Sequence, residues 1–274
     1  MMLHEHVYNV VARVKRLLCL LFFLPLLTAC DHIADDEQLI YVPQPPAKRV
    51  VLLEDYTGQR CNNCPKGTEI IDSLLASENG ESLIAVAIHS GPLGKTANQK
   101  SLLSLATETG NEYFDRWMTG QGQPVGQINR HGAVGYQNWT SQVQKEMQKE
   151  TFVDMLLSAG ISEDQIHIHV EEMSRKGSFI GKVQVWVLED SIVDSQVMPD
   201  GTVNRNYVHN HVFRTAANGT WGEDVVIGEG MKAEQAMTVP LDAKWNVGHL
   251  SVVAFAYNDN GVEQAVKEKV ETLQ

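Results

Sequence analysis

Between residues 49 and 150, short apolar runs alternate with segments of helical periodicity. The runs 50–53 and 83–88 are continuous, which is typical of strands buried on both faces of a parallel sheet. Apolar residues recur at helical spacing after the first run, and a stripe that starts at Trp139 indicates a closing helix. The order β-α-β-α-β-α predicts an α/β domain over 49–150.

After Thr151 the helical period disappears and apolar residues alternate with polar ones. Clusters of turn-forming residues, such as Pro199-Asp200-Gly201, separate the alternating segments. Many short strands with regular turn signals predict an all-β, immunoglobulin-like sandwich domain over 151–274. The alternating segments are 152–158, 166–170, 183–187, 207–213, 236–241 and 252–257.

The first thirty residues predict export and not a folded element. Basic residues precede an apolar run, Leu17–Leu27, of signal-peptide length. The run ends in Leu27-Thr28-Ala29-Cys30, which resembles a bacterial lipobox, where a peptidase cuts before a cysteine that carries diacylglycerol. An ordinary signal peptide or an anchor helix with an incidental cysteine is the alternative. We expect a signal peptide over 1–29, a lipid on Cys30 and a Pro-bearing tether over 30–48.

Composition and charge narrow the functional classes. The 274 residues are 43% hydrophobic, as in globular proteins. The formal net charge of -12 argues against binding of nucleic acid, which needs clustered Lys and Arg. Export would bring the chain to a compartment where a pair of cysteines can exist oxidised. No sequence motif indicates a cofactor.

Cys61 and Cys64 are the two cysteines left for chemistry once Cys19 and Cys30 are assigned to the export segment. The thiolate is the attacking species in thiol–disulfide exchange, and a helix N-terminus stabilises it. We expect Cys61 at a helix start, with Arg60 adding positive potential, and Cys64 one turn on to resolve the mixed disulfide. A structural disulfide and half of a zinc site are the alternatives, although zinc would need further ligands that are not nearby in sequence.

The residues around this pair carry a resemblance. Segment 51–65 resembles the active-site strand and turn of the thioredoxin superfamily, with Asp55 six residues before the first cysteine. The resemblance implies that Asp55 assists proton transfer from the resolving thiol. It also implies that Pro124 is a cis-proline that brings the Gln123 backbone next to Cys61. A trans proline at the start of a strand is the alternative.

Two departures from thioredoxins leave the redox direction open. Arg60 stands where a tryptophan usually precedes the first cysteine, and the intervening dipeptide is Asn62-Asn63 in place of Gly-Pro. Because that dipeptide tunes the reduction potential, the resemblance does not decide between an oxidase and a reductase.

Further motifs carry a closer resemblance. They are Glu54-Asp55-Tyr56-Thr57-Gly58 with Cys-x-x-Cys-Pro, Gly122-Gln123-Pro124 with Asn129-Arg130, and Tyr207-Val208-His209-Asn210-His211. Together they resemble a family of Bacteroidetes outer-membrane lipoproteins that pair a thioredoxin-like domain with a β-sandwich. The resemblance covers most of 48–274. It implies association with the outer membrane but no established reaction.

Histidines add further candidates. His89 ends the second predicted strand, where it would adjust the pKa of the attacking thiol; a strand-end histidine with satisfied hydrogen bonds is the alternative. His167 and His169 share one strand face, as do His209 and His211, and two facing pairs would make a four-histidine metal site. Solvent exposure of the first pair and packing of the second at the core edge are the alternatives.

These observations predict an outer-membrane lipoprotein, anchored through Cys30, that performs dithiol–disulfide exchange on envelope proteins. The sandwich would bind or position a partner protein. The alternative is a non-enzymatic surface-binding or adhesion lipoprotein whose Cys61–Cys64 disulfide is structural. The candidate catalytic residues are Cys61, Cys64, Asp55 and Pro124, and the candidate modulators are Arg60, His89 and Gln123.

Overall fold

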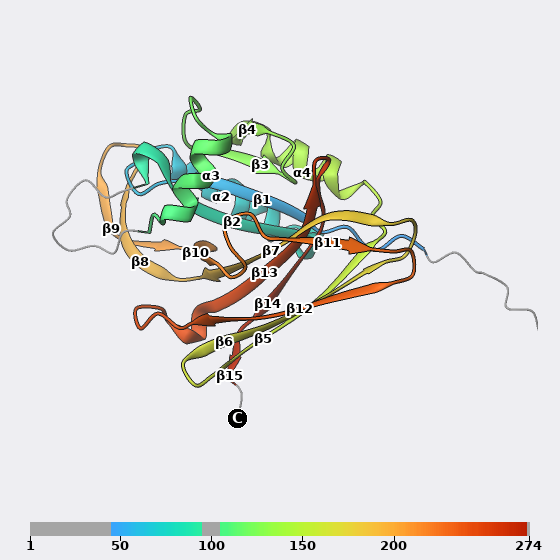
Figure 1. Ribbon diagram of the computed structural model, residues 1–274. Helices are drawn as coiled ribbons and strands as arrows, with labels where there is room; N and C mark the ends of the chain where they lie inside the picture. Colours follow the sequence, from blue (N-terminus) through green and yellow to red (C-terminus); the bar gives the residue numbers. More distant parts are fainter. Residues whose placement is uncertain (1–44, 95–104, 273–274) are drawn as a thin grey trace, which may run out of the picture. The chain divides into compact units, whose positions relative to one another are not determined.

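The computed structural model describes residues 45–94 and 105–272 (Figure 1). The predicted signal peptide, Cys30 and most of the predicted tether lie outside the described residues. The described residues belong to one compact unit. In these two stretches, no helix combines the length and the apolar character needed to cross a bilayer.

The first part of the unit has the alternation of strands and helices that the sequence predicts. β1 and β2 are parallel, β1 also pairs antiparallel with β3, and β3 pairs antiparallel with the short, unpredicted strand β4. The order runs β1 (Val51–Thr57), α2 (Cys64–Leu75), β2 (Leu83–His89), α3 (Glu108–Trp117), β3 (Val125–Ile128), β4 (Ala133–Gly135) and α4 (Trp139–Met147). Single 3-10 turns occupy Gly80–Ser82, Gly91–Leu93 and Tyr136–Asn138.

Both faces of this part of the sheet are covered. α2 and α4 pack on one face through an apolar cluster that includes Leu53, Ile71 and Trp139. α3 packs on the other face, where Tyr113 belongs to the same cluster as Leu52. Successive side chains of a strand point to opposite faces, so β1 is buried along its whole length. This explains the apolar run at its start, and it also means that the polar side chains of Glu54 and Asp55 are buried.

The second part of the unit is built from strands, and its two sheets have the character of a sandwich. β12, β6, β5 and β15 form a four-stranded sheet, which faces strands of a larger sheet across an apolar core that includes Ile168, Val185 and Val252. The strands are β5 (Val153–Ser162), β6 (Gln165–Ser174), β7 (Phe179–Glu189), β8 (Ile192–Val197), β9 (Val203–His209), β10 (Val212–Ala216), β11 (Glu223–Ile227), β12 (Lys232–Pro240), β13 (Leu250–Asn258), β14 (Gly261–Lys269) and β15 (Glu271–Thr272), with a 3-10 turn at Val247–His249.

The two parts share one sheet (Figure 1). Its order is β14-β13-β7-β10-β2-β1-β3-β4, with β11 also pairing with β7. The link between the parts is narrow: the Ala87 N–H donates to the His211 carbonyl oxygen at 2.8 Å, and β10 aligns with β2 only at Val212. The change of pattern near residue 150 is therefore a change of secondary structure, and the hydrogen-bonded sheet continues across it.

Strands β7 and β13 are buried on both faces. Val185 and Val187 of β7 face the sandwich core, whereas Trp186 and Leu188 face the core shared with α3 and β1. Phe255 of β13 belongs to the same core as Trp186 and Leu188. The predicted alternation of buried valines with polar residues holds only for the face toward the sandwich core. The residues between the valines are buried as well, because they pack against the α/β part.

A buried ion pair also joins the two parts. Arg130 follows β3, and its Nε lies 2.8 Å from Oε1 of Glu54 on β1, with both side chains buried. The Arg130 guanidinium carbon lies 5.6, 4.7 and 4.3 Å from the ring centroids of Trp186, Phe255 and Tyr257. A cation over aromatic rings is stabilised by their quadrupoles. Because these rings belong to β7 and β13, the contact ties the α/β part to the sandwich.

β8 and β9 form a hairpin that is a separate two-stranded sheet. The predicted turn at Pro199-Asp200-Gly201 closes it, and the Met198 N–H donates to the Thr202 carbonyl oxygen at 2.8 Å. The hairpin reaches the loop after β1, where the Val197 N–H donates to the Gln59 carbonyl oxygen at 2.9 Å. It therefore lies next to the predicted redox site.

Candidate functional site

Cys61 and Cys64 form a disulfide just after β1, with their Cα atoms 5.3 Å apart. α2 begins at Cys64, with Pro65 in its first turn, where no backbone hydrogen bond is lost. Cys61 lies in the preceding turn, and its N–H donates to the Gly58 carbonyl oxygen at 3.0 Å. The expectation that Cys61 starts the helix is wrong by three residues, because Asn62-Asn63 remains in a turn, the conformation that asparagine favours.

β3 begins after a cis peptide bond between Gln123 and Pro124, which confirms the predicted cis geometry. Pro124 is buried, and a Cβ atom at Gly67 of α2 would come within 3.4 Å of the Pro124 Cβ. The Gln123 Nε2 donates to the carbonyl oxygens of Thr57 at 2.8 Å and Ser90 at 2.9 Å. Gln123 thus ties together the ends of β1 and β2. Its backbone contact with the first cysteine stays a prediction.

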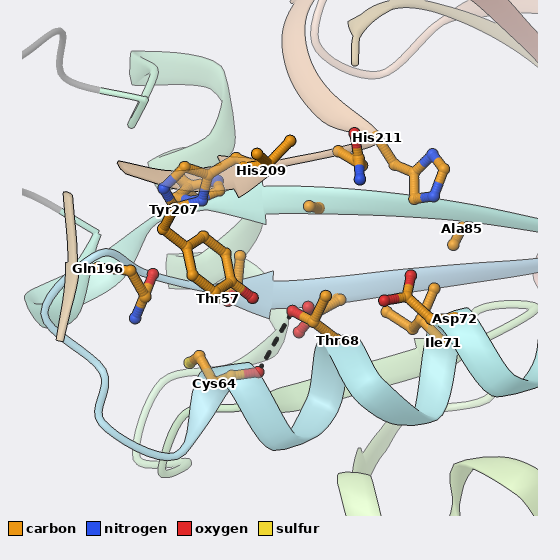
Figure 2. Close-up of a pocket in the computed structure, with 15 residues that line it drawn as sticks. Thr57, Cys64, Thr68, Ile71, Asp72, Ala85, Gln196, Tyr207, His209 and His211 are labelled. Atoms are coloured by element: carbon orange, nitrogen blue, oxygen red, sulfur yellow. Dashed lines mark hydrogen bonds between the residues drawn. The ribbon is translucent and has the colours of Figure 1, made fainter. Parts of the chain in front are cut away.

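Asp55 lies on β1 and is 1% exposed. It lines a cavity of about 30 Å³ together with Cys64, Thr68 and Tyr207 (Figure 2). A cavity of this size has room for a water molecule. Burial raises the pKa of Asp55 to about 8, and its Oδ1 has no hydrogen-bond partner among residues 45–94 and 105–272. The carboxyl is therefore protonated at pH 7 and able to donate a proton within the cavity.

The β8–β9 hairpin covers the disulfide. Cys61 and Cys64 are only 1% and 2% exposed. Figure 2 shows Gln196 and the ring of Tyr207 on the hairpin side of the cavity, opposite Cys64 and Thr68 of α2. The Thr68 hydroxyl is 3.5 Å from the Cys64 carbonyl oxygen. Both cysteines are therefore closed to a reagent in this state.

Hydrogen bonds hold the hairpin to the loop that carries Cys61. The Gln196 Nε2 donates to the Cys61 carbonyl oxygen at 2.9 Å and lies 3.3 Å from the Gly58 carbonyl oxygen. The Gln59 Nε2 donates to the Ser195 carbonyl oxygen at 3.1 Å. In addition, the Val197 N–H donates to the Gln59 carbonyl oxygen. The contact is therefore made by polar groups on both sides.

His89 and His209 form a buried pair beside the cavity, with ring centroids 5.2 Å apart and ring planes at 72°. Burial, aided by the neighbouring His209, lowers the pKa of His89 well below its ordinary value. Burial also lowers the pKa of His209 to about 4. Both imidazoles are neutral at pH 7, so His89 brings no positive charge to the thiols. Each ring has a backbone hydrogen bond, His89 with Ala87 and His209 with Ser195, but the His89 Nδ1 and the His209 Nε2 have no hydrogen-bond partner among the described residues.

The four histidines of the two strand pairs do not form a common site. His167 and His169 lie on the exposed face of β6, whereas His209, the last residue of β9, is buried. His211 pairs with Asp190, with 3.0 Å between Nδ1 and Oδ1. Among residues 45–94 and 105–272, no three or more His, Cys, Asp or Glu side chains form a group that could hold a metal ion. The four-histidine metal site is therefore not formed.

Sequence reasoning missed the cover over the disulfide. The Tyr207–His211 segment was predicted as a strand and as a source of metal ligands, not as a cover, and no local signal pointed to Gln196, which is 135 residues away from Cys61. Arg60, by contrast, is exposed, and its backbone N–H donates to the Leu93 carbonyl oxygen at 3.1 Å. The cysteine pair was found from the sequence, but its environment was not.

The chain matches a known protein family. The family model described as outer membrane protein Omp28 matches residues 111–274. The chain belongs to the Omp28 family. Its location is therefore the outer membrane, which confirms the predicted location. The matched residues include most of α3, all of α4 and the whole sandwich, but they do not include the Cys61–Cys64 disulfide.

Solved structures provide a comparison of the fold. HBP35 of Porphyromonas gingivalis is 15% identical over 83% of this chain and 77% of that chain, with a TM-score of 0.65. A domain of the outer membrane lipoprotein Omp28 from Porphyromonas gingivalis is 22% identical over 45% of this chain and 92% of that chain, with a TM-score of 0.35. No curated protein matches the chain. The likeness to HBP35 shows a shared fold and carries no activity with it.

Proposed function

We propose that this Omp28-family protein exchanges disulfides with envelope proteins through a thioredoxin-like site. The observation that carries the proposal is the neutral, buried carboxyl of Asp55 in the cavity that Cys64 lines. A buried carboxyl without a hydrogen-bond partner destabilises a fold, and a disulfide that only braces the fold does not need one. The strand order around β1 supports the same proposal.

The exchange takes two steps. A thiolate of the partner protein attacks the Cys61 sulfur, a mixed disulfide forms, and the Cys61–Cys64 bond breaks. Cys64 leaves as a thiolate and takes the proton of Asp55. A second thiol of the partner then attacks its own sulfur in the mixed disulfide, which oxidises the partner and releases Cys61 as a thiolate. The reverse sequence, starting from reduced Cys61, would reduce a partner disulfide.

The N-terminal segment supplies the membrane anchor in this proposal. Cys30 would carry the lipid, and two or three acyl chains on one residue give stable attachment. The 19 residues of the predicted tether 30–48 would span at most about 65 Å when extended. The site would thus act on envelope proteins within that distance of the membrane.

Trapping of mixed disulfides in the native envelope tests the proposal. In a Cys64→Ser variant the resolving sulfur is absent, so we expect Cys61 to accumulate in mixed disulfides with envelope proteins. These complexes appear on non-reducing gels and disappear after reduction. Cys61→Ser is the matched control, since it keeps one thiol but removes the attacking one. Equal complex formation by the two variants would contradict the assigned roles.

A second candidate function is non-enzymatic surface binding with a structural disulfide. The burial of both cysteines favours it, because structural disulfides are inaccessible. The reduction potential of Cys61–Cys64 separates the candidates. A potential below about -300 mV is typical of inert structural disulfides, and a higher one is typical of exchange sites. We expect the higher value, measured by equilibration with a dithiol buffer.

A further inference from the structure

The β8–β9 hairpin is held differently at its base and near its tip. At the base, Ile192 packs with Leu105 and Val212 in a small apolar cluster. Near the tip, Gln196 and Val197 contact the loop after β1 through hydrogen bonds. Neither hairpin strand pairs with a strand of the two larger sheets. The base therefore resembles a hinge, and the tip is attached by a small number of polar contacts.

Little apolar surface holds the hairpin down. Val193, Val203 and Val208 are 60%, 54% and 46% exposed, so these apolar side chains are not used for packing against the rest of the protein. On the inner side, the buried Asp194 Oδ2 and His209 Nε2 have no hydrogen-bond partner. Segments with few buried apolar contacts open at a lower free energy than the whole molecule unfolds. The hairpin can therefore detach while the layered cores remain folded.

We infer that the β8–β9 hairpin is a cover that must lift before a thiol can reach the Cys61–Cys64 disulfide, with Gln196 as its latch. Gln196 is a positioning residue, since its amide binds the carbonyl oxygens of Cys61 and Gly58 and not a sulfur atom. The biological purpose of the cover rests on the proposed exchange function. The opening motion does not, because it follows from the burial of both sulfurs and from the contacts of the hairpin.

The rate of disulfide reduction tests the cover. Full-length protein in detergent is treated with dithiothreitol, whose thiolate attacks the Cys61 sulfur and breaks the S–S bond. The second thiol of the reagent closes its cyclic disulfide, which leaves Cys61 and Cys64 reduced and protonated. Alkylation after timed quenching and mass spectrometry give the reduced fraction. In the closed state the reaction waits for the hairpin to open.

Two substitutions on the hairpin separate the latch from general effects. Gln196→Ala removes the amide that binds the loop, and we expect about a tenfold faster reduction, since one or two net hydrogen bonds are lost. Arg205→Ala changes an exposed residue of β9 and is the matched control, with an expected change of less than about twofold. Equal rates for wild type and Gln196→Ala, in variants that melt as wild type does, would overturn the inference.

Hydrogen exchange on the unsubstituted protein tests the same motion without a variant. The Val197 amide, which donates to Gln59, reports the closed hairpin, and the β13 amides report the central sheet. We expect Val197 to exchange at least about 100-fold faster than the β13 amides, with little dependence on low urea concentrations. If Val197 exchanged only with global unfolding, the hairpin would not be a movable cover.

The two proposals fail in different ways. Faster reduction of Gln196→Ala, without mixed disulfides in the Cys64→Ser envelope, would support the cover and contradict the exchange function. Mixed disulfides in that envelope, with equal reduction rates for wild type and Gln196→Ala, would support exchange and contradict the cover.

Discussion

The cores around β7 and β13 are filled by apolar side chains. The space beneath the β8–β9 hairpin is lined by buried polar groups. Trp186 and Phe255 are fully buried among other apolar side chains. On the inner side of the hairpin, Asp55, His89 and His209 are buried, and each has a polar atom without a hydrogen-bond partner in the part of the chain that the structure describes. Burial of apolar surface contributes about 25 cal/mol per Å², whereas an unpaired buried polar group costs about 1–3 kcal/mol. Stability is thus concentrated in the cores, and chemistry at the site.

The two regions also differ in the titratable groups that they bury. The core around Trp186 holds the paired Glu54 and Arg130 and three tyrosines, Tyr56, Tyr113 and the partly buried Tyr257. The space beneath the hairpin contains a carboxyl and imidazoles whose pKa values are displaced by burial. Changes in the core should therefore act equally at every pH, and changes at the site should depend on pH.

The largest expected effect comes from the core. Trp186→Ala should lower the free energy of unfolding by about 4 kcal/mol, because a large buried side chain is replaced by a cavity. Urea unfolding followed by circular dichroism measures this loss at pH 5 and pH 8. Trp186→Phe, the matched control, should lose less because the ring contacts are partly kept. A loss that changed strongly between the two pH values would break the comparison.

At the site, Asp55→Asn should remove a pH dependence of the free energy of unfolding. The pKa of Asp55 is raised from 3.8 to about 8, so the folded state binds an extra proton between these values. The stability of the wild type therefore falls as pH rises from 4 to 8, and the variant escapes this fall. We expect the stability of the variant relative to wild type to rise by about 4 kcal/mol between pH 4 and pH 7.

The exposed Asp72 of α2, which borders the same cavity, provides the control for this measurement. Asp72→Asn should leave the pH dependence of unfolding close to that of wild type. If Asp55→Asn followed the same curve as Asp72→Asn, the Asp55 carboxyl would not be held neutral by burial.

A smaller effect of opposite sign is expected for His209→Gln. The pKa of His209 is lowered to about 4, so below pH 6.5 the unfolded state binds a proton that the folded state does not. Wild-type stability should fall as pH decreases from 6.5 to 4, and the variant should avoid about 2 kcal/mol of this loss. Thermal unfolding at both pH values measures it, with the exposed His167→Gln as control.

The smallest expected effect comes from a carboxyl within the sandwich. Glu172 of β6 is buried, neither of its oxygens has a hydrogen-bond partner, and burial raises its pKa to about 7. Glu172→Gln should gain about 1 kcal/mol relative to wild type as pH rises from 4.5 to 7. Exposed Glu234→Gln on the neighbouring strand is the control. A pH-independent result would mean that the polar site beneath the hairpin alone responds to protons.

Much of the α/β part could be predicted because its signals are local. The apolar run of β1 reports burial on both faces, and the stripe that starts at Trp139 reports one face of α4. Cys61 and Cys64 are three residues apart, so their pairing needs only one turn of chain. The helix start was misjudged by three residues, since a turn and a first helical turn have similar sequence signals.

The second part was predictable as strands and turns but not as packing. The valines of β7 indicated one buried face, and only the structure shows that Trp186 packs against the α/β part. An alternating pattern reports that a side chain is buried, but it does not identify the neighbour that buries it. The ring contacts of Arg130 illustrate the same limit, because they join residues 56 to 127 positions apart in the chain.

The sequence by itself determined the kind of chemistry available to this protein: one cysteine pair, a carboxyl on the preceding strand and a proline that opens a later strand. Only the tertiary structure decided how accessible that chemistry is. The hairpin that covers Cys61 comes from a segment 135 residues away. It is held by hydrogen bonds between side-chain amides and backbone carbonyls, and such bonds produce no periodic pattern in the sequence. Local patterns encode burial and turns, whereas the contact between two distant polar segments exists only once the sheets have formed.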